Sequence, residues 1–239
     1  MTLRDALDRL RTGEPADRRA ALEVIANLAD ARATALVAAC LQDADPDVVT
    51  LAEATLWRIW GRSSDPRVDR LFAAGIKAME AQDWLGAVAA FTRVVETAPT
   101  FAEGWNKRAT ARYLAEHYAS AIADCEEVVR LNPHHFGALA GQGLCHSALA
   151  QYREAAHCFR RALAIYPRLD GVRQNLARVQ QELVRGNGHG GGHGGVRLSG
   201  RNQRPAEPPG HPRRDGGLAN PPRPVNRHHF PHPPMILYG

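Results

Sequence analysis

Large apolar and small residues recur along the middle of the chain at a fixed interval of 34 positions. Pro99, Pro133 and Pro167 show this interval most plainly. The same spacing links further columns of related residues: Trp84, Tyr118 and Tyr152; Ala87, Ala121 and Ala155; Gly75, Ala109 and Gly143; Leu71, Trp105 and Leu139; Phe91, Cys125 and Phe159; Val94, Val128 and Ala162. So many aligned columns in three copies indicate an internal repeat.

Each copy predicts two helices joined by a short polar turn. In the first copy the helices are expected at 69–81 and 85–97, with the turn at 82–83. The small residues Gly75 and Ala87 let the two helices approach closely, while Leu71, Phe91 and Val94 fill the space between them. The proline ends the second helix because it lacks an N–H and disfavours a helical predecessor. Since one hairpin cannot bury its apolar stripe alone, the copies are expected to stack into an all-α, right-handed solenoid.

The repeated segment, roughly 65–170, resembles an array of tetratricopeptide repeats (TPRs). The resemblance rests on Trp105 and on the glycine, alanine and proline columns, although Leu71 and Leu139 replace the family's aromatic residue in repeats one and three. Residues 171–185 have the amphipathic pattern of a closing helix, so the array is expected to span 65–185. The resemblance implies a protein that binds other proteins through a concave groove lined by the first helix of each repeat, and that is not an enzyme.

The first 64 residues are also helical by pattern but do not fit the 34-residue register. Helices are expected at 3–11, 16–28, 33–42 and 46–61, and Asp45-Pro46 and Asp65-Pro66 are good helix starts. Residues 41–48, followed by Ala52, Ala54 and Leu56, resemble a HEAT-type repeat, another protein-binding helical unit. The alternative is a helical cap that shields the first TPR hairpin.

The charge of the chain is concentrated at its end. The formal net charge is +5, and residues 186–239 hold seven arginines and two acidic residues, so the other 185 residues sum to zero. The same 54 residues contain 12 of the 21 glycines, 10 of the 16 prolines and 6 of the 11 histidines. This composition predicts a disordered tail without a packed core. The runner-up function is weak association of this Arg/His-rich tail with nucleic acid or with metal ions.

Cysteine usage and hydropathy favour a cytoplasmic protein. The four cysteines lie far apart with no CxxC pair, which argues against a disulfide scaffold or a cysteine zinc site and suits a reducing compartment. The longest small or apolar run, 33–41, is far shorter than the roughly 20 residues that cross a bilayer. The first eleven residues carry charges where a signal peptide needs an apolar stretch.

The predicted groove residues lie on the outer stripe of each repeat's first helix. They are Phe72, Ile76 and Met79 in repeat one, Asn106, Lys107, Thr110 and Tyr113 in repeat two, and Ala140, Leu144 and Ser147 in repeat three. One TPR class grips the C-terminal carboxylate of heat-shock chaperones with basic residues, but the first helix of repeat three has neither Lys nor Arg. A helical or extended partner segment with apolar anchors is therefore favoured. The alternative is that the N-terminal helices cover Phe72 and Ile76, which then line no site.

No catalytic residue, cofactor or metal site is predicted. The sequence lacks the glycine-rich phosphate loops and the HExxH and GxSxG motifs. Cys145-His146 and His157-Cys158 could bring thiol and imidazole together in repeat three, but their spacing fits no zinc pattern and cysteine is usually a buried small hydrophobe. A protein partner of unknown identity is the expectation.

Overall fold

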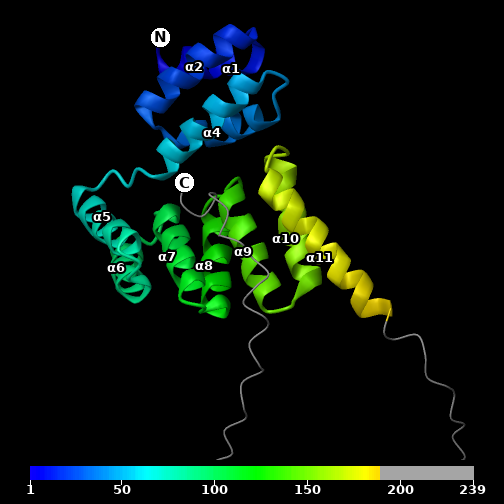
Figure 1. Cartoon of the computed structure of the whole chain (residues 1–239). Helices are drawn as coiled ribbons and strands as arrows, with labels where there is room; N and C mark the ends of the chain where they lie inside the picture. Colours follow the sequence, from blue (N-terminus) through cyan, green and yellow to red (C-terminus); the bar gives the residue numbers. More distant parts are fainter. Residues whose placement is uncertain (189–239) are drawn as a thin grey trace, which may run out of the picture.

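The computed structural model describes residues 1–188, and all regular structure in that range is helical. The N-terminal part contains α1 (Leu3–Thr12), α2 (Pro15–Leu28), η1 (Ala31–Ala33), α3 (Thr34–Ala39), η2 (Cys40–Gln42) and α4 (Pro46–Trp60). The repeats contain α5 (Pro66–Glu80), α6 (Trp84–Thr97), α7 (Ala102–Leu114), α8 (Tyr118–Leu131), α9 (Phe136–Ala148) and α10 (Tyr152–Ile165), and α11 (Asp170–Gly188) closes the series. Figure 1 shows α5 to α11 side by side in a curved row, with α1 to α4 as a layer above it.

The helix boundaries follow the 34-residue interval. The second helices of the repeats begin at Trp84, Tyr118 and Tyr152, and each ends two residues before the repeat's proline. The turns between paired helices also repeat, since Gln82, Glu116 and Ala150 adopt left-handed backbone angles with φ of 57°, 62° and 56°. The predicted all-α TPR solenoid is confirmed.

Two glycines determine how closely the helices of repeats one and three pack. A Cβ placed on Gly75 would lie 2.5 Å from the Phe91 ring, and one placed on Gly143 would lie 2.5 Å from the Phe159 ring. Repeat two has Ala109 and Cys125 in these positions, so a larger residue on the first helix is matched by a smaller one on the second. This steric pairing explains why the two columns vary together.

Local signals set the N-terminal helices. Thr2 and Asp5 form a reciprocal capping box at α1, and the Asp45 carboxylate accepts hydrogen bonds from the backbone N–H groups of Asp47 and Val48 at α4. The single helix predicted at 33–42 is split into α3 and two flanking 3₁₀ turns. The last helix continues to Gly188, three residues into the segment expected to be tail. The remainder of the predicted tail, 189–239, lies outside the described residues.

The N-terminal layer packs on repeat three. The Trp57 ring lies edge-on to Phe136 at 5.4 Å, and the Trp60 ring stacks on His135 at 4.3 Å. The Tyr166 hydroxyl donates a hydrogen bond of 2.8 Å to Glu53. The buried residues of α1–α4 and of repeat three therefore form one continuous apolar cluster. The sequence analysis predicted a domain boundary at 64/65. Its alternative interpretation, in which the N-terminal helices cap the first hairpin, is wrong, because no residue of α1–α4 belongs to the apolar cluster of repeat one.

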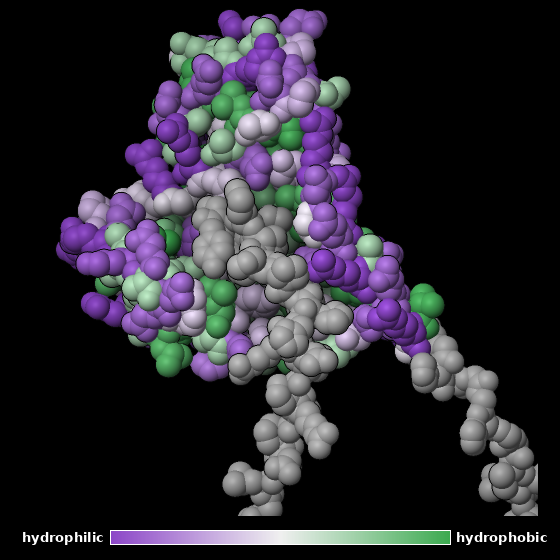
Figure 2. All heavy atoms as spheres, in the orientation of Figure 1, coloured by the Kyte–Doolittle hydropathy of each residue, from purple (hydrophilic) through white to green (hydrophobic). Residues whose placement is uncertain are grey.

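Hydrophilic residues predominate on the face of the molecule shown in Figure 2. In the view of Figure 2, hydrophilic residues cover much of the α1–α4 layer and of α11, while hydrophobic residues appear in small separate areas. Within residues 1–188, no helix is long enough and apolar enough to cross a membrane.

Candidate functional site

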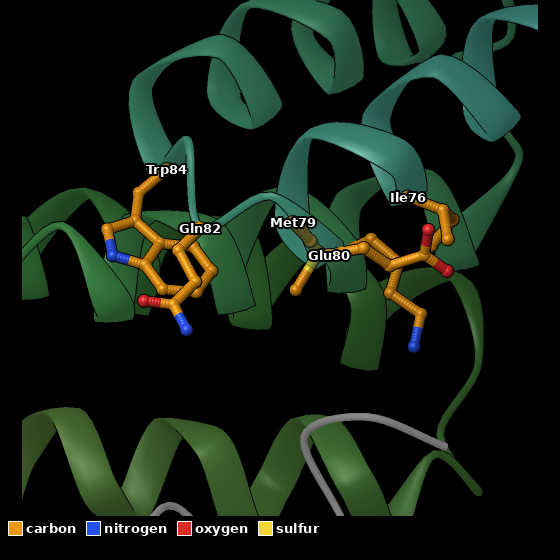
Figure 3. Close-up of a pocket in the computed structure, with 6 residues that line it drawn as sticks. Ile76, Met79, Glu80, Gln82 and Trp84 are labelled. Atoms are coloured by element: carbon orange, nitrogen blue, oxygen red, sulfur yellow. The ribbon is translucent and has the colours of Figure 1, made fainter.

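An open hollow lies between repeats one and two, beside the end of α5 and the start of α6. It has a volume of about 350 Å³ and is lined by Ile76, Met79, Glu80, Gln82, Trp84 and Lys107. Figure 3 shows Trp84 and Gln82 at one end, Ile76 at the other, and Met79 between them. Three of the ten predicted groove residues, Ile76, Met79 and Lys107, are thus brought together.

The hollow combines apolar and polar walls. Ile76, Met79 and Trp84 supply hydrophobic surface, while Glu80 and Gln82 are exposed at its edge. Lys107 also lines the hollow, and its ammonium lies 3.5 Å from Glu103 Oε1. Sites with this mixture bury the apolar part of a ligand and orient the ligand through hydrogen bonds to its polar groups.

Phe72 lies inside repeat one and outside the hollow. Its ring makes edge contacts with Phe91 and Phe101, each at a centroid distance of 5.5 Å. The alternative in which the N-terminal helices cover Phe72 and Ile76 does not describe this arrangement, because α4 packs on repeat three. Phe72 is covered by the helices of its own array instead.

The predicted residues of α7 are mostly packed. Asn106 and Thr110 are buried, and the Thr110 hydroxyl donates a hydrogen bond of 3.0 Å to the Asn106 carbonyl. With the half-buried Tyr113 they border a small space of about 10 Å³ between α7, α8 and α9. Burial, with smaller effects from Tyr118 and Cys145, raises the pKa of Tyr113 to about 12. A space this small holds no partner side chain.

Helix α9 presents its predicted residues to the protein interior. Ala140, Leu144 and Ser147 are 2%, 3% and 8% exposed, and the first two belong to the cluster shared by repeat three and the N-terminal helices. In the described arrangement repeat three therefore offers little open apolar surface at these positions.

A buried cluster of hydrogen-bonded polar side chains joins repeats two and three, and the sequence analysis did not predict it. The Ala138 N–H donates to His135 Nδ1 at 3.0 Å, which leaves the proton on Nε2 to donate to Glu103 Oε2 at 3.0 Å. Asn106 Nδ2 donates to the other oxygen of Glu103 at 3.2 Å. Burial raises the pKa of Glu103, but the hydrogen bond from His135 and the charge of Lys107 outweigh it and hold the pKa below its usual value.

The 34-residue register offers one signal for this cluster. His135 occupies the N-cap position that Phe101 holds in the preceding repeat, and a polar residue there caps α9 through its ring nitrogen. Trp84 belongs to a repeated column, but nothing in the sequence indicates that it lines a hollow with Glu80 and Gln82.

The thiols of repeat three are unsuited to nucleophilic chemistry. Burial raises the pKa of Cys145 to about 12 and that of Cys158 to about 11, so both remain protonated at neutral pH. His146 Nδ1 lies 2.7 Å from the Gln151 side-chain oxygen, and His157 is exposed. Within 1–188, no three His, Cys, Asp or Glu side chains converge as a metal ion would require.

Comparisons with known proteins point to the TPR class. No protein-family model matches the chain. A TPR repeat-containing protein of Rhizobium etli is 27% identical over 146 residues, which cover 61% of this chain and 71% of that protein. Sperm-associated antigen 1 of Rattus norvegicus is 30% identical over 109 residues, 46% of this chain but 12% of that protein. Among solved structures, the Sgt2 TPR domain of Aspergillus fumigatus aligns with a TM-score of 0.50 and 20% identity, over 56% of this chain and 90% of that domain.

Proposed function

We propose that this tetratricopeptide repeat protein is a non-catalytic adaptor that binds a segment of another protein at the hollow between repeats one and two. The observation that carries the proposal is the meeting of Ile76, Met79 and Trp84 with Lys107 in one open recess of about 350 Å³. Two α5 residues of this recess, Ile76 and Met79, are predicted groove residues, and α5 is the first helix of its hairpin.

The chemistry of the recess selects a partner with a large apolar side chain. Burying one such side chain contributes about 1.5–3 kcal/mol, and Glu80 and Gln82 at the edge can form hydrogen bonds with backbone groups of the partner segment. A helix or an extended strand can supply this anchor, because a helix presents side chains three to four residues apart to a groove and a strand presents every second side chain. The expected partner is a short segment, since one hollow this size accommodates few residues.

The state of the candidate groups in repeat three supports an adaptor over an enzyme. The candidates for nucleophilic chemistry in repeat three are protonated thiols, and the imidazole of His135 is fully used by Ala138 and Glu103. A cytoplasmic location belongs to the same proposal, because the four cysteines are buried as free thiols.

The proposal is tested by selecting peptides from a random display library with the full chain and measuring their affinity by calorimetry. We expect Ile76→Glu to weaken the selected peptides at least tenfold, because a carboxylate would replace the apolar wall. Glu80→Lys, at an exposed position on the same recess, should change the affinity without harming the fold. Leu85→Glu is the matched control, because Leu85 is 65% exposed and does not line the recess.

Two results would reject the site. One is a selection that enriches no peptide. The other is equal binding by the Ile76→Glu, Glu80→Lys and Leu85→Glu variants when all three keep the circular dichroism spectrum of the parent chain.

A further inference from the structure

The helical part of the chain has no net charge, but its acidic and basic residues are unevenly distributed along the sequence. Residues 1–151 contain sixteen basic and twenty acidic side chains, an excess of four negative charges. Residues 152–188 contain seven arginines and three acidic residues, an excess of four positive charges. The structure concentrates this second group in α10, α11 and the connection between them.

The arginines of this region are exposed, and several lack an acidic partner. Arg173 pairs with Asp170 and Arg185 with Glu182, while Arg168 donates to the Asp43 carbonyl oxygen at 3.1 Å. Within residues 1–188, no carboxylate forms an ion pair with the other four, which are Arg153, Arg160, Arg161 and Arg178. Their charges therefore face solvent uncompensated.

These charges are distributed along two adjacent helices. Along α10, Arg153 and Arg160 are separated by about 11 Å at 1.5 Å per residue, and along α11, Arg173 and Arg185 are separated by about 18 Å. The two helices pack side by side at the end of the row. In Figure 2, hydrophilic residues dominate the right-hand side of the molecule, where α11 lies. We call the exposed arginines 153, 160, 161, 173, 178 and 185 the arginine flank.

We propose that the arginine flank binds the phosphate backbone of double-stranded nucleic acid without reading its sequence. A duplex presents one negative charge about every 1.7 Å along its axis, so a flank of this length can meet several phosphates. Every basic residue of the flank is arginine, whose planar fork contacts phosphate oxygens in pairs. The seven further arginines at 189–239 follow α11 directly in sequence and have the same sign.

A duplex fits this surface better than a single strand does. Proteins that hold single strands without sequence preference stack bases on exposed aromatic rings. The aromatic side chains on α10 and at its end do not offer such a platform, because Phe159 and Tyr166 are buried and Tyr152 is half-buried. Charge without stacking surface is the signature of backbone binding.

The test measures binding of a 30-base-pair DNA duplex to the full chain by fluorescence anisotropy at 50 and 200 mM salt. Four phosphate contacts predict that affinity falls about 100-fold between these salt concentrations. Replacing Arg153, Arg160, Arg161 and Arg178 with Gln should weaken binding at least tenfold and lower the salt slope by about 3 to 4. The matched control replaces Arg4, Arg58, Arg70 and Arg93, which are equally exposed and change the net charge by the same amount.

Three outcomes would overturn the proposal. The first is an equal loss of affinity in the two quadruple variants, which would show a general effect of net charge. The second is binding that disappears when the seven arginines of 189–239 become Gln but is untouched by the substitutions on α10 and α11. The third is binding of a poly-glutamate peptide as tight as that of the duplex at the same salt concentration, which would assign the flank to an acidic protein.

Discussion

At the residue scale, the fold depends on steric pairs that the sequence repeats. Gly143 faces the Phe159 ring so closely that any added carbon must displace it. The columns 75/109/143 and 91/125/159 are visible in the sequence, which predicted that Gly75 lets the helices approach closely and that Phe91 fills the space between them. What they did not show is that the size of one residue sets the size of the other, because that requires knowing that the two positions touch.

Gly143→Ala is therefore expected to lower the free energy of unfolding by about 2 kcal/mol, since overpacking typically costs about 1–3 kcal/mol. The double variant Gly143→Ala/Phe159→Cys recreates the Ala109/Cys125 pair of repeat two, and the added Ala should cost less than 1 kcal/mol in that background. Urea titrations of the two single variants and the double variant measure this coupling. Additive losses would mean that the two residues do not constrain each other.

The Glu103 carboxylate gives a second prediction at this scale. Its pKa is lowered in the folded chain, so its contribution to stability is fully present above the unfolded value of about 4.3 and is lost as pH falls through the lowered folded value. Glu103→Gln should lower the free energy of unfolding by about 2 kcal/mol at pH 7, because a charged hydrogen-bond acceptor is removed. The difference between parent and variant should shrink below pH 4.

The control for this measurement is Glu96→Gln, at an exposed position, which should stay within about 0.5 kcal/mol of the parent. A difference for Glu103→Gln that is constant from pH 7 to pH 3 would contradict the assigned direction of its pKa shift. Sequence reasoning missed Glu103 and His135, because their meeting joins two different repeats and neither residue belongs to a repeated column.

At the scale of elements, the sequence predicted the helices of the repeats to within a few residues, since proline and polar turns mark their ends. Its error in the N-terminal part was the helix expected at 33–42, which is split into α3 and two 3₁₀ turns. The Ala-rich composition of that stretch favours a helix, but a segment this short leaves most of its terminal backbone groups without intrahelical partners. The tighter 3₁₀ turns satisfy some of these groups.

The repeated left-handed residue in the helix-to-helix turn gives a prediction for this scale. Ala150 is exposed and has φ of 56°, a conformation that costs a residue with a Cβ about 1 kcal/mol or more. Ala150→Gly should therefore leave stability unchanged or raise it by up to about 1 kcal/mol, despite the greater freedom of glycine in the unfolded chain. Ala123→Gly, at an exposed position inside α8, should lower stability by about 1 kcal/mol.

Thermal unfolding followed by circular dichroism at 222 nm compares these two glycine variants directly. If Ala150→Gly destabilised the chain as much as Ala123→Gly does, the turn would not have the strained backbone described for it.

At the scale of the whole molecule, the arrangement of the N-terminal layer was the least predictable feature. Its apolar stripes predict helices that need a partner surface, but they do not say which of three similar hairpins provides it. The α4 residues Trp57 and Trp60 pack on repeat three, where their rings contact those of Phe136 and His135. The candidate site also differs from the predicted groove, because the sequence does not show which elements pack on which helix face. A helical stripe gives the face of a helix, whereas burial of Ala140 and Leu144 depends on which elements cover that face.

Trp60→Ala tests this contact. Trp60 is 7% exposed, so truncation should lower the free energy of unfolding by about 3–5 kcal/mol and separate the melting of the N-terminal layer from that of the array. Trp60→Phe should cost much less, because the buried indole N–H has no hydrogen-bond acceptor among the described residues. Scanning calorimetry of the three proteins distinguishes one transition from two. An unchanged single transition in Trp60→Ala would show that the Trp60 side chain does not contribute to the packing of the layer on the array.

The central claim is that the hollow between repeats one and two receives a peptide, and methyl NMR tests it most directly. The chain is labelled at the methyl groups of isoleucine and methionine, and a peptide selected from the library is added in steps. The claim predicts that the signals of Ile76 and Met79 shift in a saturable way while those of Ile25 and Ile59, in the core of the N-terminal layer, remain in place. Saturable shifts that leave Ile76 and Met79 unmoved would contradict it.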